Sequence, residues 1–250
     1  SGDNPFEAAK ALGLAAIQVF VADPQSWKSP IIPGGLTAEQ FRAGAADAGV
    51  DVFVHARYVI NVATTNNKVR IPSRKMLQAD MDAAASIGAK GLIVHGGHVT
   101  ADDDPMVGFA NWRKAVEQLD MKVPLLLENT AGGNHAMARR LDAIKHLWDA
   151  VGDSGAGFCL DTCHAHAGGI PMGDVAETIL GITGRIDLVH CNDSRDGFDS
   201  GADRHANLGN GHIDLDEIVH CLRTAAAPVI LETPAEAHDA DLRTLAAKLA

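Results

Sequence analysis

Short apolar runs alternate along this sequence with longer amphipathic or alanine-rich stretches. Seven runs have the length and composition of buried strands, and they cover residues 16–21, 50–54, 92–94, 124–127, 157–160, 186–189 and 228–231. Stretches with a helical pattern separate them and cover residues 37–47, 73–87, 111–119, 136–150, 174–180, 214–225 and 235–249. Continuous apolar strands separated by helices predict a parallel sheet whose outer face is covered by helices.

This alternation predicts an α/β fold, a (β/α)8 TIM barrel that spans residues 1–250 as a single domain. A chain of 250 residues has the usual length of such a barrel, and no linker or internal repeat suggests a second domain. A closed barrel of this type needs eight strands, whereas the pattern supplies seven. Because Asp3, Asn4 and Pro5 already have the character of a helix start, we expect the first strand to be missing from this chain or from its numbering.

Composition narrows the class of protein. Hydrophobic residues make up 46% of the chain, which is enough for a large core. No stretch reaches the ~18 uninterrupted apolar residues of a membrane span, and the chain starts without the segments of a signal peptide. We therefore expect a cytoplasmic protein that has no membrane contact, and buried free thiols at all four cysteines. The net charge of −11 argues at first sight against a nucleic-acid partner, because DNA binding relies on neutralising phosphates.

Six consecutive strands end in a residue of a type that binds metals. These residues are His55, His95, Glu128, Asp161, His190 and Glu232. The carboxyl ends of barrel strands converge on one face, which is where barrel active sites lie. Loops at this face add His164, three residues after Asp161, and the pair Asp203 and His205. The sequence therefore predicts nine candidate ligands around one point.

Nine ligands exceed what one metal ion, with about four to six positions, can use. Imidazoles and carboxylates without thiolates suit Zn²⁺ or Mn²⁺, and carboxylates can bridge neighbouring ions. A single histidine at a strand end is more often a hydrogen-bonded core residue than a ligand. Burying four carboxylates in one barrel mouth without cations, however, would cost several kcal/mol for each of them. The joint placement therefore predicts more than one metal ion.

Two further patterns leave alternatives open. Cys159 and Cys163 flank Asp161 and are conceivable zinc ligands, although simple packing is the favoured interpretation. The glycine-rich run at 209–211 fits a backbone nest that cradles a phosphate, and it fits a tight turn equally well.

Five blocks of this sequence resemble the signature segments of the endonuclease IV family of abasic-site nucleases. The blocks are HARYVINVA at 55–63, LENTAG at 127–132, CLDTCHA at 159–165, HCNDS at 190–194 and DRHANLGNG at 203–211. They occur in the family's order, and the resemblance runs from about residue 25 to residue 232. Members of this family are zinc enzymes built on a (β/α)8 barrel, so the resemblance implies the same fold and three Zn²⁺ ions, with Mn²⁺ as an alternative at one or more positions.

The resemblance also implies how the candidate ligands divide among the metals. The first ion is expected between His55, His95 and Glu128. The second is expected between Glu128, which would bridge the two ions, and Asp161, His190 and Glu232. The third is expected between His164, Asp203 and His205. Glu128 and Glu232 are the candidate catalytic carboxylates.

Candidate DNA contacts follow from the same resemblance. Tyr58 and Val59 are expected to enter the DNA at the lesion, and the loop that carries Trp27 is expected to contact the strand. Arg204 is a further candidate contact. Gln25, a further candidate contact, stands where some relatives carry an arginine that reads the lesion.

The predicted function is a metal-dependent DNA repair endonuclease. It would hydrolyse the phosphodiester 5′ to an abasic site in double-stranded DNA, leaving a 3′-hydroxyl and a 5′-deoxyribose phosphate. Removal of groups that block 3′ ends and a monomeric state are also expected. The negative net charge is compatible with this function because metal ions and seven cations are expected at the site, namely Arg57, Lys68, Arg70, Arg74, Lys75, Arg195 and Arg204.

Two alternatives remain. The nearer one is a metal-dependent sugar isomerase or epimerase on the same barrel, although a third metal has no role in moving a proton between sugar carbons. The other is a scaffold protein with structural metals. Structural zinc sites are usually closed by four ligands, whereas His55, His95 and Glu128 leave a position open.

Overall fold

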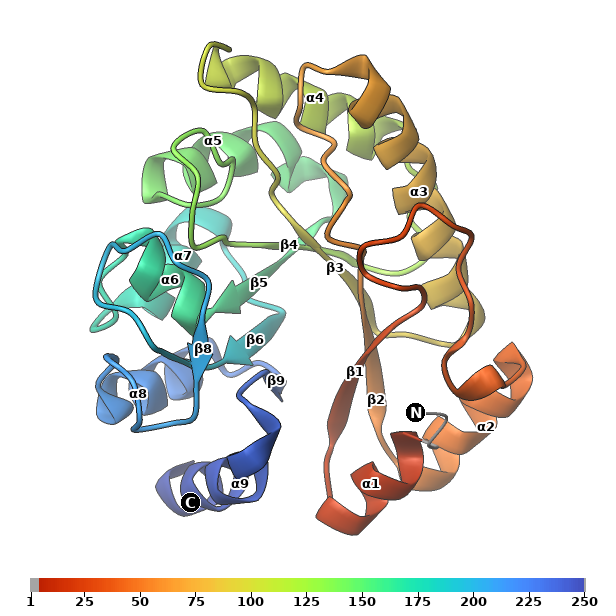
Figure 1. Cartoon of the computed structure of the whole chain (residues 1–250), viewed down its shortest axis with the longest axis vertical. Coiled ribbons are helices and arrows are strands. Elements are labelled where there is room, and N and C mark those ends of the chain that lie inside the picture. Colours follow the sequence, from red (N-terminus) through yellow and green to blue (C-terminus); the bar gives the residue numbers. More distant parts are fainter. Residues whose placement is uncertain (1–4, 250) are drawn as a thin grey trace.

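Seven parallel strands form the centre of the molecule in a computed structural model, which describes residues 5–249 (Figure 1). The strands are β1 (Ala16–Phe20), β2 (Asp51–His55), β3 (Gly91–His95), β4 (Leu125–Glu128), β5 (Gly157–Asp161), β6 (Leu188–Cys191) and β9 (Val229–Leu231). They pair in the order β1-β2-β3-β4-β5-β6-β9, and every pair is parallel. The predicted strands and the predicted barrel class are therefore confirmed.

Helices surround the sheet as the alternating pattern predicts (Figure 1). They are α1 (Pro5–Leu12), α2 (Ala38–Ala48), α3 (Asn67–Ser86), α4 (Pro105–Gln118), α5 (Leu141–Val151), α6 (Thr162–Gly168), α7 (Val175–Thr183), α8 (Leu215–Ala225) and α9 (His238–Leu249). Between residues 5 and 249, three short 3-10 turns accompany them: η1 (Pro33–Gly35), η2 (Gly152–Ser154) and η3 (Ala235–Ala237). Of the predicted helix start at residues 3–5, Asp3 and Asn4 lie outside the described residues.

Capping residues explain where several helices begin. Thr37 and Gln40 form a reciprocal capping box at the start of α2. Helices α3 and α4 begin six residues earlier than their apolar patterns suggest, because Asn66 and Asp104 cap their first turns. Helix α5 begins five residues later than predicted, and the preceding segment forms a loop at the mouth of the barrel.

The barrel interior is filled by one apolar side chain from each of six strands. These are Phe53, Ile93, Leu126, Cys159, Leu188 and Ile230. Side chains two residues apart on a strand point to the same face, so the residues that follow this layer also point inward. They are His55, His95, Glu128, Asp161, His190 and Glu232. The apolar layer therefore closes the barrel below, and the candidate ligands form the layer above it.

The sheet is open between β1 and β9. Among the described residues, no hydrogen-bonded ladder joins these two strands. A cavity of about 370 Å³ lies between them, and helices α1 and α9 contribute to its walls. The chain from residue 5 to residue 249 thus supplies seven strands of a nearly closed barrel.

Two short elements beyond β6 build the rim of the barrel mouth. Strands β7 (Asp193–Ser194) and β8 (His205–Ala206) pair antiparallel, and neither was predicted because each has only two residues. Their pairing brings His205 back toward the strand ends. No helix in residues 5–249 is long and apolar enough to cross a membrane.

Candidate metal centre

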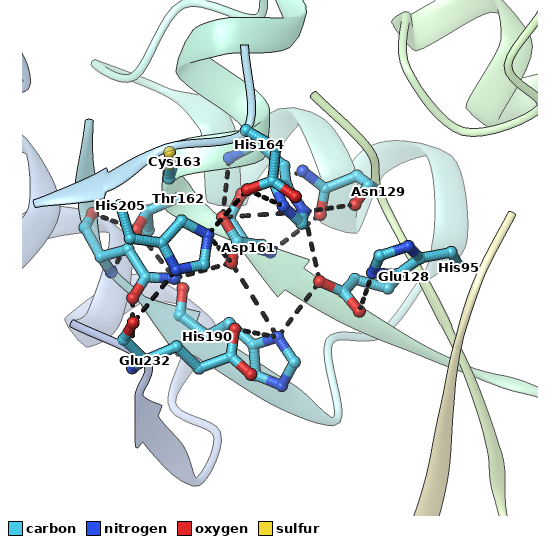
Figure 2. Close-up of polar contacts among 12 residues, drawn as sticks. His95, Glu128, Asn129, Asp161, Thr162, Cys163, His164, His190, His205 and Glu232 are labelled. Atoms are coloured by element: carbon cyan, nitrogen blue, oxygen red, sulfur yellow. Dashed lines mark hydrogen bonds and ion pairs between the residues drawn. The ribbon is translucent and has the colours of Figure 1, made fainter. Parts of the chain in front are cut away.

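The nine predicted ligands meet at the mouth of the barrel, beside the carboxyl ends of the strands. Figure 2 shows His95, Glu128, Asp161, His164, His190, His205 and Glu232 around this point. They fall into three groups in which one ligand-type atom from each residue lies within 4.8 Å of the others. The groups are His55, His95 and Glu128; Glu128, Asp161, His190 and Glu232; and His164, Asp203 and His205. The structure thus brings all nine residues together, in the three sets that the family resemblance implies.

Glu128 lies between histidines on both sides. Its Oε2 lies 3.1 Å from Nε2 of His55 and 3.3 Å from Nε2 of His95. Its Oε1 lies 3.1 Å from Nδ1 of His190 and 3.2 Å from Nδ1 of His164. The two oxygens therefore face different pairs of imidazoles, which suits a carboxylate that bridges two ions.

The third group has the features of an ion site. Nε2 of His164 and Nε2 of His205 each lie 3.1 Å from Oδ1 of Asp203. Both nitrogens are buried and make no hydrogen bond with the described residues. Two buried imidazole nitrogens that converge on one carboxylate without hydrogen bonds fit a divalent cation between them.

Four of the histidines have their remaining ring nitrogen held by an oxygen atom. Nδ1 of His55 lies 2.6 Å from the carbonyl of Ala56, Nδ1 of His164 lies 2.9 Å from that of Asn129, and Nδ1 of His205 lies 3.1 Å from that of Glu232. Nε2 of His190 lies 2.7 Å from Oε1 of Gln18. Metal-binding histidines usually donate their other N–H in this way, which leaves an unprotonated nitrogen for the ion.

Two asparagines that the strand-end pattern does not single out hold Asp161. The side chain of Asn129 accepts a hydrogen bond from the Asp161 N–H (2.8 Å) and donates one to its carbonyl (2.9 Å). Nδ2 of Asn192 donates to Oδ2 of Asp161 (2.7 Å). The available sequence signal is their position, because each lies one or two residues beyond a strand-end ligand.

Burial and mutual charge shift the protonation of this centre. Burial alone would raise the pKa of the Glu128 carboxyl, but the charges of His95 and His190 outweigh it, and the pKa lies well below its usual value. Burial would lower the pKa of His205, but nearby carboxylates, including that of Asp203, raise it to about 9. The centre therefore carries protons that a divalent cation would displace.

The cysteines near the centre are packing residues. Burial raises the pKa of both the Cys159 and the Cys163 thiol to about 12, so both are neutral near pH 7. Cys163 does lie within reach of Asp161 and His205. All four cysteines are buried, and none forms a disulfide within residues 5–249, as predicted.

Tyr58 stands at the mouth of the centre. Its ring stacks on His95 at 5.6 Å between centroids and meets His55 edge-on at 5.3 Å. The side chain is about half exposed, and the neighbouring Val59 is partly buried against the core. The Tyr58 N–H donates to the carbonyl of Pro24 (2.9 Å), which joins this turn to the loop that carries Trp27.

The other candidate DNA contacts lie at the surface. Gln25 is exposed, and its backbone N–H donates to Oδ1 of Asp23 (2.9 Å). Arg204 is exposed and pairs with Asp196. Trp27 is 49% exposed on its loop, so an aromatic ring is available to a partner there.

Arg57, one of the cations expected at the site, is not available to a phosphate there. The Arg57 side chain is buried, and its Nη2 lies 2.6 Å from Oδ1 of the buried Asp80. Its Nη1 donates to the carbonyls of Ser26 and Lys28. The buried Arg57 side chain therefore holds the backbone on both sides of Trp27. The pairing joins residues 23 positions apart, which no local pattern reveals.

The glycine-rich run at 209–211 is a turn closed by a carboxylate. Both oxygens of Asp193 are occupied, because they accept hydrogen bonds from the N–H groups of Ser194, Gly209, Gly211 and Ile213. An internal carboxylate thus fills the place that a phosphate would take in a nest. Of the two alternatives for this run, the structure supports the turn.

The loop that carries Asp203 is held by two arginines. Nη2 of Arg139 and Nη2 of Arg140 lie 3.0 and 2.7 Å from Oδ1 of Asp199. Asp199 has a φ of 61°, which residues other than glycine seldom adopt, and its N–H donates to the carbonyl of His166 (3.1 Å). These contacts fix the loop against α6 and the segment after β4.

The family model described as "Xylose isomerase-like TIM barrel" matches residues 6–249. The chain is 54% identical over 249 residues to "Probable endonuclease 4" of Mycobacterium marinum, which covers all of this chain and 96% of the relative. It is 53% identical over 245 residues to the protein of the same name from Mycobacterium tuberculosis, covering 98% and 95%.

Solved structures agree with these matches. Endonuclease IV from Thermus thermophilus superposes with a TM-score of 0.82 at 33% identity, covering 98% of this chain and 92% of that one. A D-tagatose 3-epimerase-like protein superposes with a TM-score of 0.74 at 18% identity, covering 95% and 91%, and at that identity it shares the fold alone. The extent of these matches, together with the metal-type cluster at the strand ends, shows that the chain belongs to the endonuclease IV family of xylose isomerase-like TIM barrels.

Proposed function

We propose that this endonuclease IV family member hydrolyses the phosphodiester on the 5′ side of abasic sites in double-stranded DNA. The products would be a 3′-hydroxyl and a 5′-deoxyribose phosphate, and the same centre would clear blocked 3′ ends as a phosphatase and diesterase. We infer that the protein acts as a monomer in the cytoplasm. One observation carries the proposal: three groups of ligand-type side chains lie together, and Glu128 belongs to two of them.

We propose three Zn²⁺ ions as the cofactors, with Mn²⁺ possible at one or more positions. The residues fit such ions because the imidazole nitrogens that face inward meet carboxylates, whereas four of the opposite ring nitrogens are held by oxygens. The chemistry that divalent ions supply when bound is activation of a water molecule and neutralisation of charge on the reacting phosphate.

The two candidate catalytic carboxylates have different surroundings. Glu128 is buried, and both of its oxygens lie among histidines. Its role is therefore to fix the spacing between the two ligand groups to which it belongs. Glu232 is partly exposed, and its Oε2 lies 3.3 Å from Nδ1 of His190. We assign Oε2 of Glu232 as the atom that orients the attacking water and accepts its proton.

Tyr58 and the Trp27 loop form the contact surface that we propose for the lesion. The half-exposed Tyr58 ring covers His55 and His95, so it would shield these two ligands from solvent. The same ring would face the gap that the lost base leaves in the DNA. A nucleotide without a base costs little to swing out of the helix, which favours abasic sites over intact ones. Among the predicted cations, Lys68, Lys75, Arg195 and Arg204 are exposed and able to meet phosphates.

The sugar isomerase or epimerase alternative is disfavoured by the third group. His164, Asp203 and His205 offer ligands for a third ion beside the two groups that share Glu128, whereas one or two ions suffice to move a proton between sugar carbons. The epimerases that share this fold are below 20% identical to this chain. Membership of the endonuclease IV family also favours the nuclease function over the epimerase function.

The test is incision of a labelled duplex that contains one tetrahydrofuran abasic analogue, which cannot undergo β-elimination. We expect a cut on the 5′ side that leaves a 3′-hydroxyl, a loss of cutting with a chelator, and recovery with zinc. Epimerisation of a ketohexose by zinc-loaded protein that leaves the duplex intact would support the alternative.

A further inference from the structure

Gln18 lies in strand β1 at the position that corresponds to the ligand layer. Ala16 packs against the apolar layer inside the barrel, and Gln18 follows it by two residues, as His55 follows Phe53 and Glu232 follows Ile230. Strand β1 is thus the one described barrel strand that adds an amide to this layer in place of an imidazole or a carboxylate.

The Gln18 amide contacts two members of the same metal group. Its Oε1 lies 2.7 Å from Nε2 of His190, and its Nε2 donates to Oε1 of Glu232 at 2.5 Å. These contacts join residues 172 and 214 positions apart in the sequence. An amide offers one acceptor and a donor group, so it satisfies a ring N–H and a carboxylate at the same time.

The Gln18 amide determines which ring nitrogen of His190 is available to bind an ion. Because Oε1 of Gln18 can only accept, Nε2 of His190 must carry a hydrogen, and Nδ1, which faces Glu128, is the nitrogen that is left to bind an ion. His55, His164 and His205 have their outer nitrogens on backbone carbonyls. Among these four histidines, His190 alone depends on a side chain, and a substitution can therefore remove its partner.

Gln18 also spans the open side of the sheet. Among the described residues, no ladder joins β1 to β9, and Gln18 and Glu232 both line the cavity between these strands. The hydrogen bond from Gln18 to Glu232 therefore holds this carboxylate toward the centre from across the gap.

We propose that Gln18 is a positioning residue that fixes the tautomer of His190 and the direction of Glu232 for the ion shared with Glu128 and Asp161. This inference rests on the proposed zinc centre. It goes beyond the nine ligands because Gln18 holds two of them without being one itself.

The test compares Gln18→Met, which keeps the side-chain length but removes both hydrogen bonds, with Gln118→Met, a matched change at an exposed glutamine on α4. Zinc affinity is measured by chelator competition, and the imidazoles are observed by ¹⁵N–¹H NMR. We expect Gln18→Met to lower the affinity for one of the zinc ions by about 10–100-fold. We also expect the slowly exchanging Nε2–H signal of His190 to be lost in this variant. Gln118→Met should match the wild type in both measurements.

Gln18→Glu provides a second variant, because it keeps an acceptor for His190 and removes the donor to Glu232. We expect this variant to keep the Nε2–H signal of His190. Wild-type zinc affinity together with a retained Nε2–H signal in Gln18→Met would overturn the inference. If wild-type protein binds zinc but does not cut the abasic duplex, the proposed function fails, while the effect of Gln18 on zinc still decides this inference.

Discussion

Oε1 of Glu128 lies 3.1 Å from Nδ1 of His190, although the two side chains come from strands β4 and β6, which are not neighbours in the sheet. Strand β5 lies between them and contributes Asp161 to the same group. This convergence across the barrel mouth is possible because the carboxyl ends of all strands surround one axis. It makes Glu128 the residue through which two of the proposed ion sites are linked.

Replacement of Glu128 by glutamine should abolish most of the incision activity. The amide cannot bridge two cations as a carboxylate does, and even the outer partners of metal ligands cost about 10–100-fold when they are removed. We expect kcat/KM on the abasic duplex to fall by more than about 100-fold, with an unchanged circular dichroism spectrum. Glu117→Gln, at an exposed helix position, is the matched control. Turnover of Glu128→Gln at the wild-type rate would rule out the bridging role.

Zinc binding should release protons near neutral pH. The pKa of His205 is raised to about 9, above the ~6.5 of a free histidine. The stability contributed by protonated His205 is therefore complete below about pH 6.5 and is lost as pH rises through about 9. Zinc binds the neutral imidazole, so metal-free protein should release more protons on binding zinc at about pH 7 than at about pH 9.5.

Calorimetry in two buffers of different ionisation enthalpy measures this proton release at each pH. Zinc affinity should rise with pH up to about 9 and then level off, because the histidine is by then already neutral. Equal proton release at the two pH values would contradict the raised pKa of His205.

The ion pairs of Asp199 should matter for the third group. Asp199→Gly removes the carboxylate that Arg139 and Arg140 hold, and glycine accepts the positive φ at this position without strain. The loop would then hold Asp203 less firmly, so we expect zinc to be lost first from the third group, and bound zinc to fall from about three to about two ions per chain at limiting zinc. Asp149→Gly, at an exposed ion pair, should keep three.

The buried pair of Arg57 and Asp80 should be costly to break. Asp80→Leu would leave the buried guanidinium without its carboxylate, and we expect the free energy of unfolding in urea to fall by about 3–5 kcal/mol. The double variant Arg57→Met with Asp80→Leu should recover much of this loss, because no charge is left unpaired. A double variant that is less stable than Asp80→Leu alone would contradict this reading of the pair.

The metal-type cluster could be predicted from the sequence for two reasons. The two-residue period of a strand shows which side chains point inward. All strands of a parallel barrel end at the same face, so inward-pointing residues at the strand ends must lie close together. His55 follows Phe53, and Glu232 follows Ile230, in a sequence that shows this spacing directly. Helices α2, α7, α8 and α9 lie close to their predicted positions. Caps such as Asp104 start α3 and α4 ahead of their apolar patterns, whereas α5 begins later than predicted and the short α6 was not predicted.

The residues that sequence reasoning missed depend on contacts between distant segments. Gln18 resembles any polar residue in an edge strand until β6 and β9 bring His190 and Glu232 to it. Arg57 looks like a surface cation until Asp80 is found beneath it. Such pairings are set by the register of the whole barrel, which no single segment of sequence encodes.

We propose that nine side chains hold three zinc ions at the mouth of this barrel. Diffraction data from crystals of zinc-loaded protein, collected on both sides of the zinc absorption edge, test it most directly. We expect three anomalous peaks: one between His55, His95 and Glu128, one between Glu128, Asp161, His190 and Glu232, and one between His164, Asp203 and His205. A single peak, or peaks that do not lie beside Glu128, would contradict the claim.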